Sequence, residues 1–186
     1  MNQKPKIRAV TTVAEGRLFR LEGVDLQFSN GKTAVFERVM NTGAAVMVVP
    51  ILDDGLCMVH EYANGTDRYE LGFVKGKIDE GETPQQAALR ELKEEVSLGA
   101  NRIQYIRQMH GIPHYSNFEM HLFFAWDCYP VELTEDEMGD EIEPLVKSTW
   151  RFDQIGELAN HSEINDPRVL TALWFVEKWL DNKQCT

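Results

Sequence analysis

The chain has 186 residues, of which 43% are hydrophobic and 26% are charged, as is ordinary for a soluble globular domain. Its formal net charge of −11 argues against a general binder of long nucleic acids or membrane surfaces, because those partners are themselves anionic. No apolar signal segment and no membrane-spanning run is present, so the sequence predicts a cytoplasmic protein. The widely spaced Cys57, Cys128 and Cys185 predict neither disulfides nor a zinc site.

Residues 6–41 read as an antiparallel β unit. The segments IRAVTTV, RLFRLEGVDLQF and TAVFERVM are strand-like, and Asn30-Gly31 is a typical hairpin turn. The run AAVMVVPIL at 44–52 predicts a buried strand, which Asp53-Asp54-Gly55 then turns into LCMVHEYA. A short extended piece, YELGF, follows.

A strong helix start comes next. Thr83 can cap the helix, Pro84 suits its first position, and Gln86 completes a capping box, so the sequence predicts a helix from there to about Val96.

The second half of the chain predicts strands at 102–109 and 120–129, followed by an acidic segment at 132–144. A strand near 146–151, a short helix at 152–159 and a helix opened by Asp166-Pro167 complete the pattern. The last helix carries an apolar stripe of Val169, Leu173, Val176 and Leu180. Mixed strands with helices on both sides of a sheet predict an α/β fold.

The helix from Pro84 carries three glutamates, Glu91, Glu94 and Glu95, on one face, although like charges at this spacing repel. Another side is apolar and suits the core, through Ala88, Leu89, Leu92 and Val96.

The acidic face is open to two readings. One is a solvated surface, partly neutralised by Arg90 and Lys93. The other is a cation site, favoured by the glycine-containing loop GKIDEGE that leads directly into the helix N-terminus. Carboxylate oxygens suit Mg²⁺ or Mn²⁺, which commonly share their coordination with substrate phosphates.

The stretch from Gly76 to Leu98, with Glu82, Arg90, Glu91, Leu92, Glu94 and Glu95 at fixed spacing, resembles the signature of the Nudix hydrolases. One position departs from the pattern, because Ser97 stands where the family has glycine at the helix end. The resemblance implies an α/β/α sandwich with a mixed central sheet. It also implies hydrolysis of a nucleoside diphosphate linked to another group X, assisted by Mg²⁺ or Mn²⁺.

The resemblance assigns roles to the signature residues. Glu91 and Glu95 would be the principal metal ligands, and Glu94 would add a further metal or catalytic contact. Gly76 would offer its carbonyl. Arg90 would orient a glutamate, with Glu82 as the candidate.

Most of residues 5–180 is similar to the ADP-ribose pyrophosphatase branch of the family, and to the bacterial ADP compounds hydrolases within it. The segments that carry this likeness are SNGKTAVFERV, VPILDDGLCMVHEYA and YELGFVKGKIDEGE. The branch implies an N-terminal β arm at 1–42 that pairs or swaps across a homodimer, and a Nudix domain at 43–186.

The same branch implies candidate substrate residues. Phe36 would stack on adenine with Glu37 beside it, although Phe36 could equally be a strand core residue. Many relatives carry two arginines where this chain has His60-Glu61-Tyr62-Ala63, so Arg38 or Arg68 could substitute for their contacts. Glu70 joins this group of candidates.

The catalytic base is expected outside the signature, in the acidic segment, with Glu141 as first and Glu143 as second choice; the alternative is a solvated loop. The expected substrates are ADP-ribose, diadenosine polyphosphates or NADH, cut to AMP and X-phosphate. Two alternatives stay open. One is a hydrolase of other nucleoside diphosphate derivatives or capped RNA, and the other is a non-catalytic Nudix-like ligand-binding module.

Overall fold

The structure is a computed structural model that describes residues 3–41, 43–134 and 145–184. The chain forms two compact units, which are described separately below. The first joins Met1–Ala44 to His110–Glu119, and the second comprises Ala45–Met109 and Met120–Thr186. The segment His110–Glu119, which follows the strand predicted at 102–109, groups with the arm and not with the second unit.

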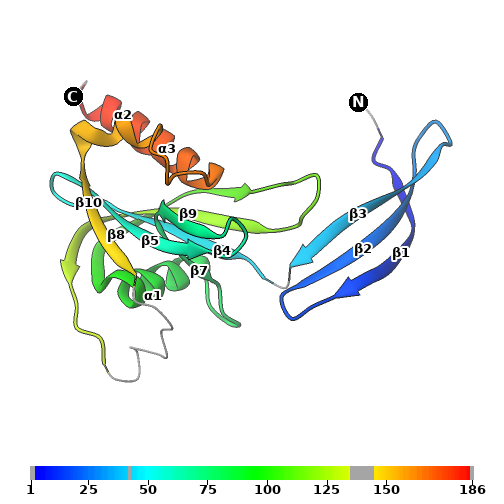
Figure 1. Cartoon of the computed structure of the whole chain (residues 1–186), viewed down its shortest axis with the longest axis horizontal. Helices are drawn as coiled ribbons and strands as arrows, with labels where there is room; N and C mark the ends of the chain where they lie inside the picture. Colours follow the sequence, from blue (N-terminus) through cyan, green and yellow to red (C-terminus); the bar gives the residue numbers. More distant parts are fainter. Residues whose placement is uncertain (1–2, 42, 135–144, 185–186) are drawn as a thin grey trace. The chain divides into compact units, whose positions relative to one another are not determined.

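The arm is a three-stranded antiparallel sheet in the order β1-β2-β3 (Figure 1). Its strands are β1 (Lys6–Glu15), β2 (Phe19–Gln27) and β3 (Thr33–Asn41). The predicted Asn30-Gly31 turn joins β2 to β3, and Gly31 adopts a φ of 82°, which a residue with a side chain would rarely accept.

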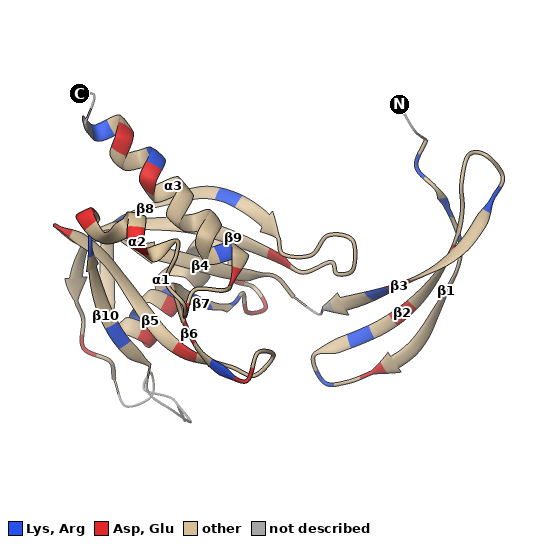
Figure 2. Ribbon diagram, turned by 45° about the horizontal axis from the view of Figure 1, so that its top comes forward, with Lys and Arg blue, Asp and Glu red and all other residues tan. Residues whose placement is uncertain are grey.

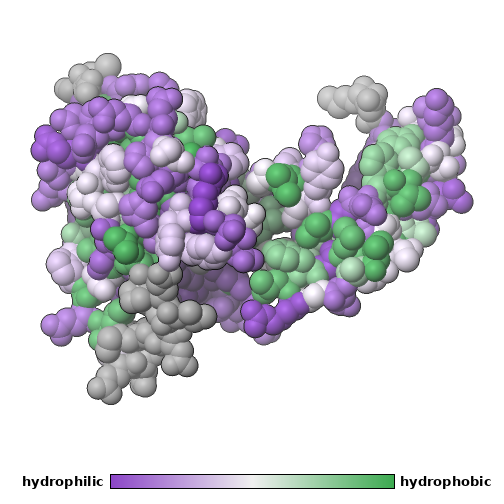
Figure 3. Space-filling view, in the orientation of Figure 1, coloured by the Kyte–Doolittle hydropathy of each residue, from purple (hydrophilic) through white to green (hydrophobic). Residues whose placement is uncertain are grey.

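The arm sheet has almost no core of its own. Every residue of β1 is exposed, and Glu22 and Val24 are the buried side chains among the described residues of the unit. Apolar side chains are spread over the face of the arm shown in Figure 3. Charged residues of both signs also lie on its strands (Figure 2). A three-stranded sheet needs a covered apolar face to be stable.

The segment after His110 extends the arm at β3. Val39 donates its backbone N–H to the carbonyl of Tyr115 at 2.7 Å, and it forms a parallel bridge with Ser116. The segment around Tyr115 and Ser116 is therefore tied to the last strand of the arm.

The second unit contains two sheets. A mixed sheet has the order β7-β4-β9-β8, in which β4 runs parallel to β9 and antiparallel to β7. An antiparallel sheet has the order β10-β5-β6. Their strands are β4 (Ala45–Pro50), β5 (Gly55–Ala63), β6 (Arg68–Gly72), β7 (Val74–Lys77), β8 (Leu98–His110), β9 (Glu119–Pro130) and β10 (Val146–Arg151). Of the piece YELGF, expected as one extended stretch, residues 69–72 lie in β6, and Phe73 stands between β6 and β7.

Helix α1 (Pro84–Val96) packs against both sheets through one buried cluster. Ala88, Leu92 and Val96 come from the helix, as predicted, with Ala87 in addition; the predicted Leu89 is only partly buried. The strands contribute Val46, Val48, Cys57, Val59, Val74, Phe123 and Ala125. This packing fixes α1 by its apolar side and leaves its acidic side to the adjoining loop and strand β7.

Helices α2 (Ile155–Leu158) and α3 (Pro167–Gln184) lie on the side of the strands away from α1 (Figure 1). The predicted stripe of α3 is buried at Val169, Leu173 and Val176, and Trp179 meets the ring of Trp126 on β9 at 6.1 Å. The unit is thus the expected α/β/α arrangement around a mixed sheet. Within the described residues, no helix is both long enough and apolar enough to cross a membrane.

Candidate active site

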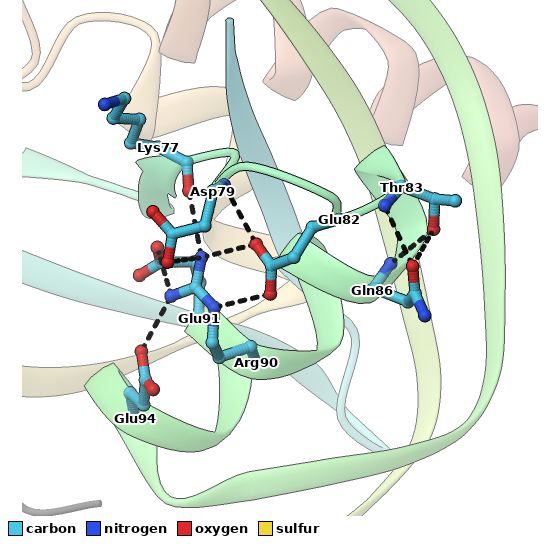
Figure 4. Close-up of polar contacts among 8 residues, drawn as sticks. All are labelled: Lys77, Asp79, Glu82, Thr83, Gln86, Arg90, Glu91 and Glu94. Carbon is cyan, nitrogen blue, oxygen red and sulfur yellow. Dashed lines mark hydrogen bonds and ion pairs between the residues drawn. The ribbon is translucent and has the colours of Figure 1, made fainter. Parts of the chain in front are cut away.

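The loop before α1 is locked to the helix start by the predicted capping box. The Thr83 hydroxyl accepts the N–H of Gln86 at 3.3 Å, and the Gln86 side chain accepts the N–H of Thr83 at 2.8 Å. Both contacts are visible in Figure 4. They satisfy N–H groups that the helix itself cannot pair, so the loop and the helix form one rigid element.

The other end of α1 is closed by a left-handed residue. Ser97 has φ 55° and ψ 41°, and its N–H donates to the carbonyls of Leu92 and Lys93. The family pattern has glycine here because glycine reaches this conformation without a Cβ penalty. The tight cap is therefore formed although the residue is serine, and the Cβ of Ser97 is sterically strained in this left-handed conformation.

Arg90 is the centre of the acidic face (Figure 4). Its guanidinium binds both carboxylate oxygens of Glu82, at 2.8 and 3.0 Å, which is the predicted pairing. It also donates to Glu91 at 2.8 Å and to Glu94 at 2.9 Å, and it reaches the carbonyl of Lys77 at 2.9 Å. One arginine thus connects the loop to two of the three signature glutamates.

The charges of this network stabilise each other. The hydrogen bonds from Arg90, helped by the backbone N–H of Asp79, lower the pKa of Glu82 to about 2. The bonds to Glu82 in turn raise the pKa of Arg90 above its ordinary value. Glu82 therefore stays ionised at neutral pH and holds Arg90 in place, which fits an orienting role.

Glu91 is the most enclosed of the signature acids, with only 9% of its surface exposed. Its carboxyl group lies directly against Gly76, so close that a Cβ at position 76 would overlap it. Burial raises the pKa of Glu91, although Arg90 opposes the shift. The glycine of the signature is needed here for space.

Glu95 lies one helical turn further along and has no arginine partner among the described residues. One of its oxygens accepts the backbone N–H of Lys75 on β7 at 3.2 Å. Burial raises the pKa of Glu95 to about 8, against the lowering effect of the Lys75 charge and N–H. The Lys75 charge thus offsets the burial of Glu95 only in part.

The residues present fit a hard divalent cation. Glu91 and Glu95 offer oxygen ligands from one helix face. Burial, and to a lesser extent neighbouring negative charge, raises the pKa of each, and a bound cation would oppose this shift. Within the described ranges no three carboxylate, imidazole or thiol side chains form a ready-made cage. Mg²⁺ does not require one, because it commonly binds through one or two carboxylates and keeps several waters.

Two residues of this region were not expected from the sequence. The ammonium of Lys75 binds Glu61 on β5 at 2.9 Å, so a cation and a fourth acid adjoin Glu95. Glu61 stands in the segment His60-Glu61-Tyr62-Ala63, which contains no arginine. Lys75 directly precedes the signature glycine Gly76, and this position in the sequence could have indicated a cation beside the acidic helix face.

The candidates Arg68 and Glu70 bind each other on β6, with 2.7 Å between Nε and Oε1. Glu70 also accepts a hydrogen bond from Thr66 and two from Asn165, which precedes α3. These contacts lower the pKa of Glu70 in spite of the burial that opposes them. The pair ties β6 to the segment before α3.

The candidates Phe36, Glu37 and Arg38 follow one another on β3. The register with β2 places Phe36 and Arg38 on one face of the arm and Glu37 on the opposite face. Phe36 is half exposed and meets Phe28 edge-on at 6.1 Å. Arg38 binds Glu22 at 2.8 Å, and Arg20 binds the same buried carboxylate at 2.7 Å. The base candidates Glu141 and Glu143 lie outside the described residues.

Known proteins resemble the chain over almost its whole length. The NUDIX domain profile matches residues 41–173, and the profile of the NudE-type Nudix hydrolase N-terminal domain matches residues 5–38. The chain is 46% identical to the ADP compounds hydrolase NudE of Escherichia coli strain K12, over 96% of this chain and 94% of that protein.

Two further relatives extend the comparison. The chain is 27% identical to an ADP-ribose pyrophosphatase of Bacillus subtilis strain 168, over 92% of each chain. A crystal structure of an ADP compounds hydrolase matches with a TM-score of 0.90 at 44% identity, covering 98% of this chain and 97% of that one. Together with the signature helix, these matches show that the chain belongs to the Nudix hydrolase family.

Proposed function

We propose that this protein is a divalent-metal-dependent hydrolase that cuts the diphosphate bond of ADP-X compounds, giving AMP and X-phosphate. The observation that carries the proposal is the enclosed pair Glu91 and Glu95 beside Gly76, two acids with raised pKa values on a rigid, capped helix. The names of the relatives support the substrate class. ADP-ribose, diadenosine polyphosphates and NADH are the substrates to test, with Mg²⁺ or Mn²⁺ as the ion.

The residues of the site would have separate roles in binding the metal ion and in orienting its ligands. Glu91 and Glu95 hold the ion, with Glu94 and the carbonyl of Gly76 as further ligands. Arg90 keeps Glu91 and Glu94 oriented while Glu82 fixes Arg90. When bound, the ion would neutralise the diphosphate oxygens and lower the pKa of the attacking water. The remaining task is to position substrate and water.

The base is proposed to be Glu141, with Glu143 as the second candidate. The support is their place in the acidic segment, which resembles the position of a loop glutamate in the family. A base must come within hydrogen-bonding reach of the water and must be deprotonated to act. Replacing the correct residue should therefore lower kcat and remove the acidic limb of its pH profile without reducing metal binding.

We further propose that the protein works as a homodimer in the cytoplasm. Support for the dimer comes from the arm, whose exposed apolar residues include Phe19, Val35 and Phe36. A sheet with so little core gains stability when a second copy covers it. The free thiols of Cys57 and Cys128 fit a reducing compartment.

The test is release of AMP from ADP-ribose, diadenosine polyphosphates and NADH with Mg²⁺ or Mn²⁺ and with EDTA. Glu91→Gln and Glu95→Gln should each lower kcat by at least ~10²-fold. Glu157→Gln, at an exposed acid of α2, is the matched control. Reaction in ¹⁸O-labelled water shows which phosphate is attacked. Tight binding of these compounds without AMP release would contradict the proposal and favour a ligand-binding module.

A further inference from the structure

Lys75 has an unusual position beside the signature helix. Its backbone N–H holds Glu95, while its ammonium binds Glu61 at 2.9 Å and the carbonyl of Phe73 at 3.2 Å. The third hydrogen of the ammonium has no partner among the described residues. The Lys75 side chain is about one-fifth exposed, and Glu61 is 45% exposed, so the pair sits at the edge of the site where solvent and ligands can enter.

The other cations considered for substrate contact are already committed. Arg90 binds three carboxylates and a carbonyl. Arg68 is held by Glu70, and Arg38 is held by the buried Glu22. The side chain of Lys77 points away from the Arg90 cluster (Figure 4). Lys75 lies next to Glu95, and among the described residues its ammonium keeps one hydrogen without a partner.

We propose that Lys75 is a phosphate-contacting residue of this site, and that Glu61 holds its ammonium in place until a substrate phosphate replaces it. This inference rests on the proposed function and names the group that substitutes for the two arginines absent from residues 60–63. The substrate feature it recognises is one phosphate of the diphosphate.

The exchange of partners is physically reasonable. A partly exposed ion pair with a single short contact is weak, because water screens it. A phosphate is an equally good hydrogen-bond acceptor that carries more negative charge, and its bond to an ammonium is charge-assisted. The backbone contact to Glu95 does not involve the side chain, so the ammonium can move without releasing the metal ligand. Gly72, next to the ammonium, leaves it room.

The test uses two variants that break the same ion pair. Lys75→Met should raise KM for ADP-ribose, and the Kd of its non-hydrolysable α,β-methylene analogue with Mg²⁺, by about tenfold. Glu61→Gln should leave both constants unchanged or lower, because it frees the ammonium. Lys75→Arg should restore most of the affinity. Lys178→Met, which breaks a Lys178–Asp181 ion pair on α3, is the control and should change neither constant.

The affinity for Mn²⁺ in the absence of substrate gives a second measurement, in which Lys75→Met should not show the loss that it shows for the analogue. Lys75→Met should bind the ion at least as tightly as the wild type, because a neighbouring positive charge is gone. Equal loss of analogue affinity in Lys75→Met and Glu61→Gln would mean that the pair is only a structural tie, and would overturn the inference. If the wild type releases no AMP but Lys75→Met still weakens analogue binding, the proposed hydrolysis fails and the phosphate contact stands.

Discussion

The carboxyl group of Glu91 fills the space that a side chain at Gly76 would need. Strand β7 and helix α1 can approach this closely only because position 76 has no Cβ, and the approach puts a strand backbone beside an enclosed acid. The spacing of the signature thus has a steric cause as well as a chemical one.

Gly76→Ala should therefore displace Glu91 and impair the site. We expect a drop in kcat of at least ~10-fold, because a small misplacement of a catalytic group is costly. Mg²⁺ should also give a smaller rise in Tm than it gives the wild type. Gly65→Ala is the control, because a Cβ there meets nothing within 4 Å. Wild-type kcat and Mg²⁺ response in Gly76→Ala would contradict the assignment.

The stability of the metal-free protein should depend on Glu95. Its folded pKa is about 8, whereas an unfolded glutamate titrates near ~4.3. The folded state then binds more protons between these values, so Glu95 lowers the free energy of unfolding as pH rises through that window. Glu95→Gln should raise Tm in EDTA at pH 9 but have little effect at pH 4. A Tm difference that is independent of pH would contradict the raised pKa.

Glu82 should affect the free energy of unfolding in the opposite direction to Glu95, because its pKa is lowered by folding and not raised. Its folded pKa is about 2, below the unfolded value of ~4.3, so its contribution is present above pH ~4.3 and is lost as pH falls toward 2. Glu82→Gln should accordingly lower Tm at pH 7 and have a smaller effect near pH 3. Thermal unfolding of both glutamine variants across pH measures the two trends in one series.

The left-handed cap at Ser97 predicts a stabilising substitution. Ser97→Gly removes the Cβ that is strained at φ 55°, and it should raise the free energy of unfolding by about 0.5–1 kcal/mol. For a chain of this size the rise in Tm is about 1–4 °C. Ser97→Ala keeps the Cβ and should give no such gain, which separates relief of strain from loss of the hydroxyl.

If the arm forms the interface of a homodimer, a charge introduced on its exposed apolar surface should weaken the dimer. Val35 is 69% exposed on β3, and Val35→Asp should shift the protein toward a smaller species in light scattering coupled to size exclusion, because it would bury a charge in the proposed interface. Val146→Asp is the control, since Val146 is 65% exposed on β10 in the other unit. An unchanged mass for Val35→Asp over a range of concentrations would argue against the arm as the interface.

Much of the site was open to prediction because its determinants are local. Capping by Thr83 and Gln86, the shared face of the glutamates and the pairing of Arg90 with Glu82 all follow from spacing within one loop and one helix. The Lys75–Glu61 pair was not foreseen, because it joins β7 to β5 and depends on how two sheets meet.

The engagement of Arg38 by Glu22 was likewise missed, since it depends on the register of β2 with β3. Local periodicity gives the face of each residue but not its partner across strands. For the same reason the contact between Val39 and Ser116 could not be read from the chain.

That last contact changes what the arm is as a folding unit. Because His110–Glu119 belongs with residues 1–44, the chain crosses between the two units three times, after Ala44, Met109 and Glu119. The arm is therefore not a detachable N-terminal appendage. Removing the arm would leave the backbone groups of Tyr115 and Asn117 without their hydrogen bonds to Val39. Because β3 and residues 110–119 are bonded to each other, a substitution that changes the amide exchange rate in one of them should change it in the same direction in the other.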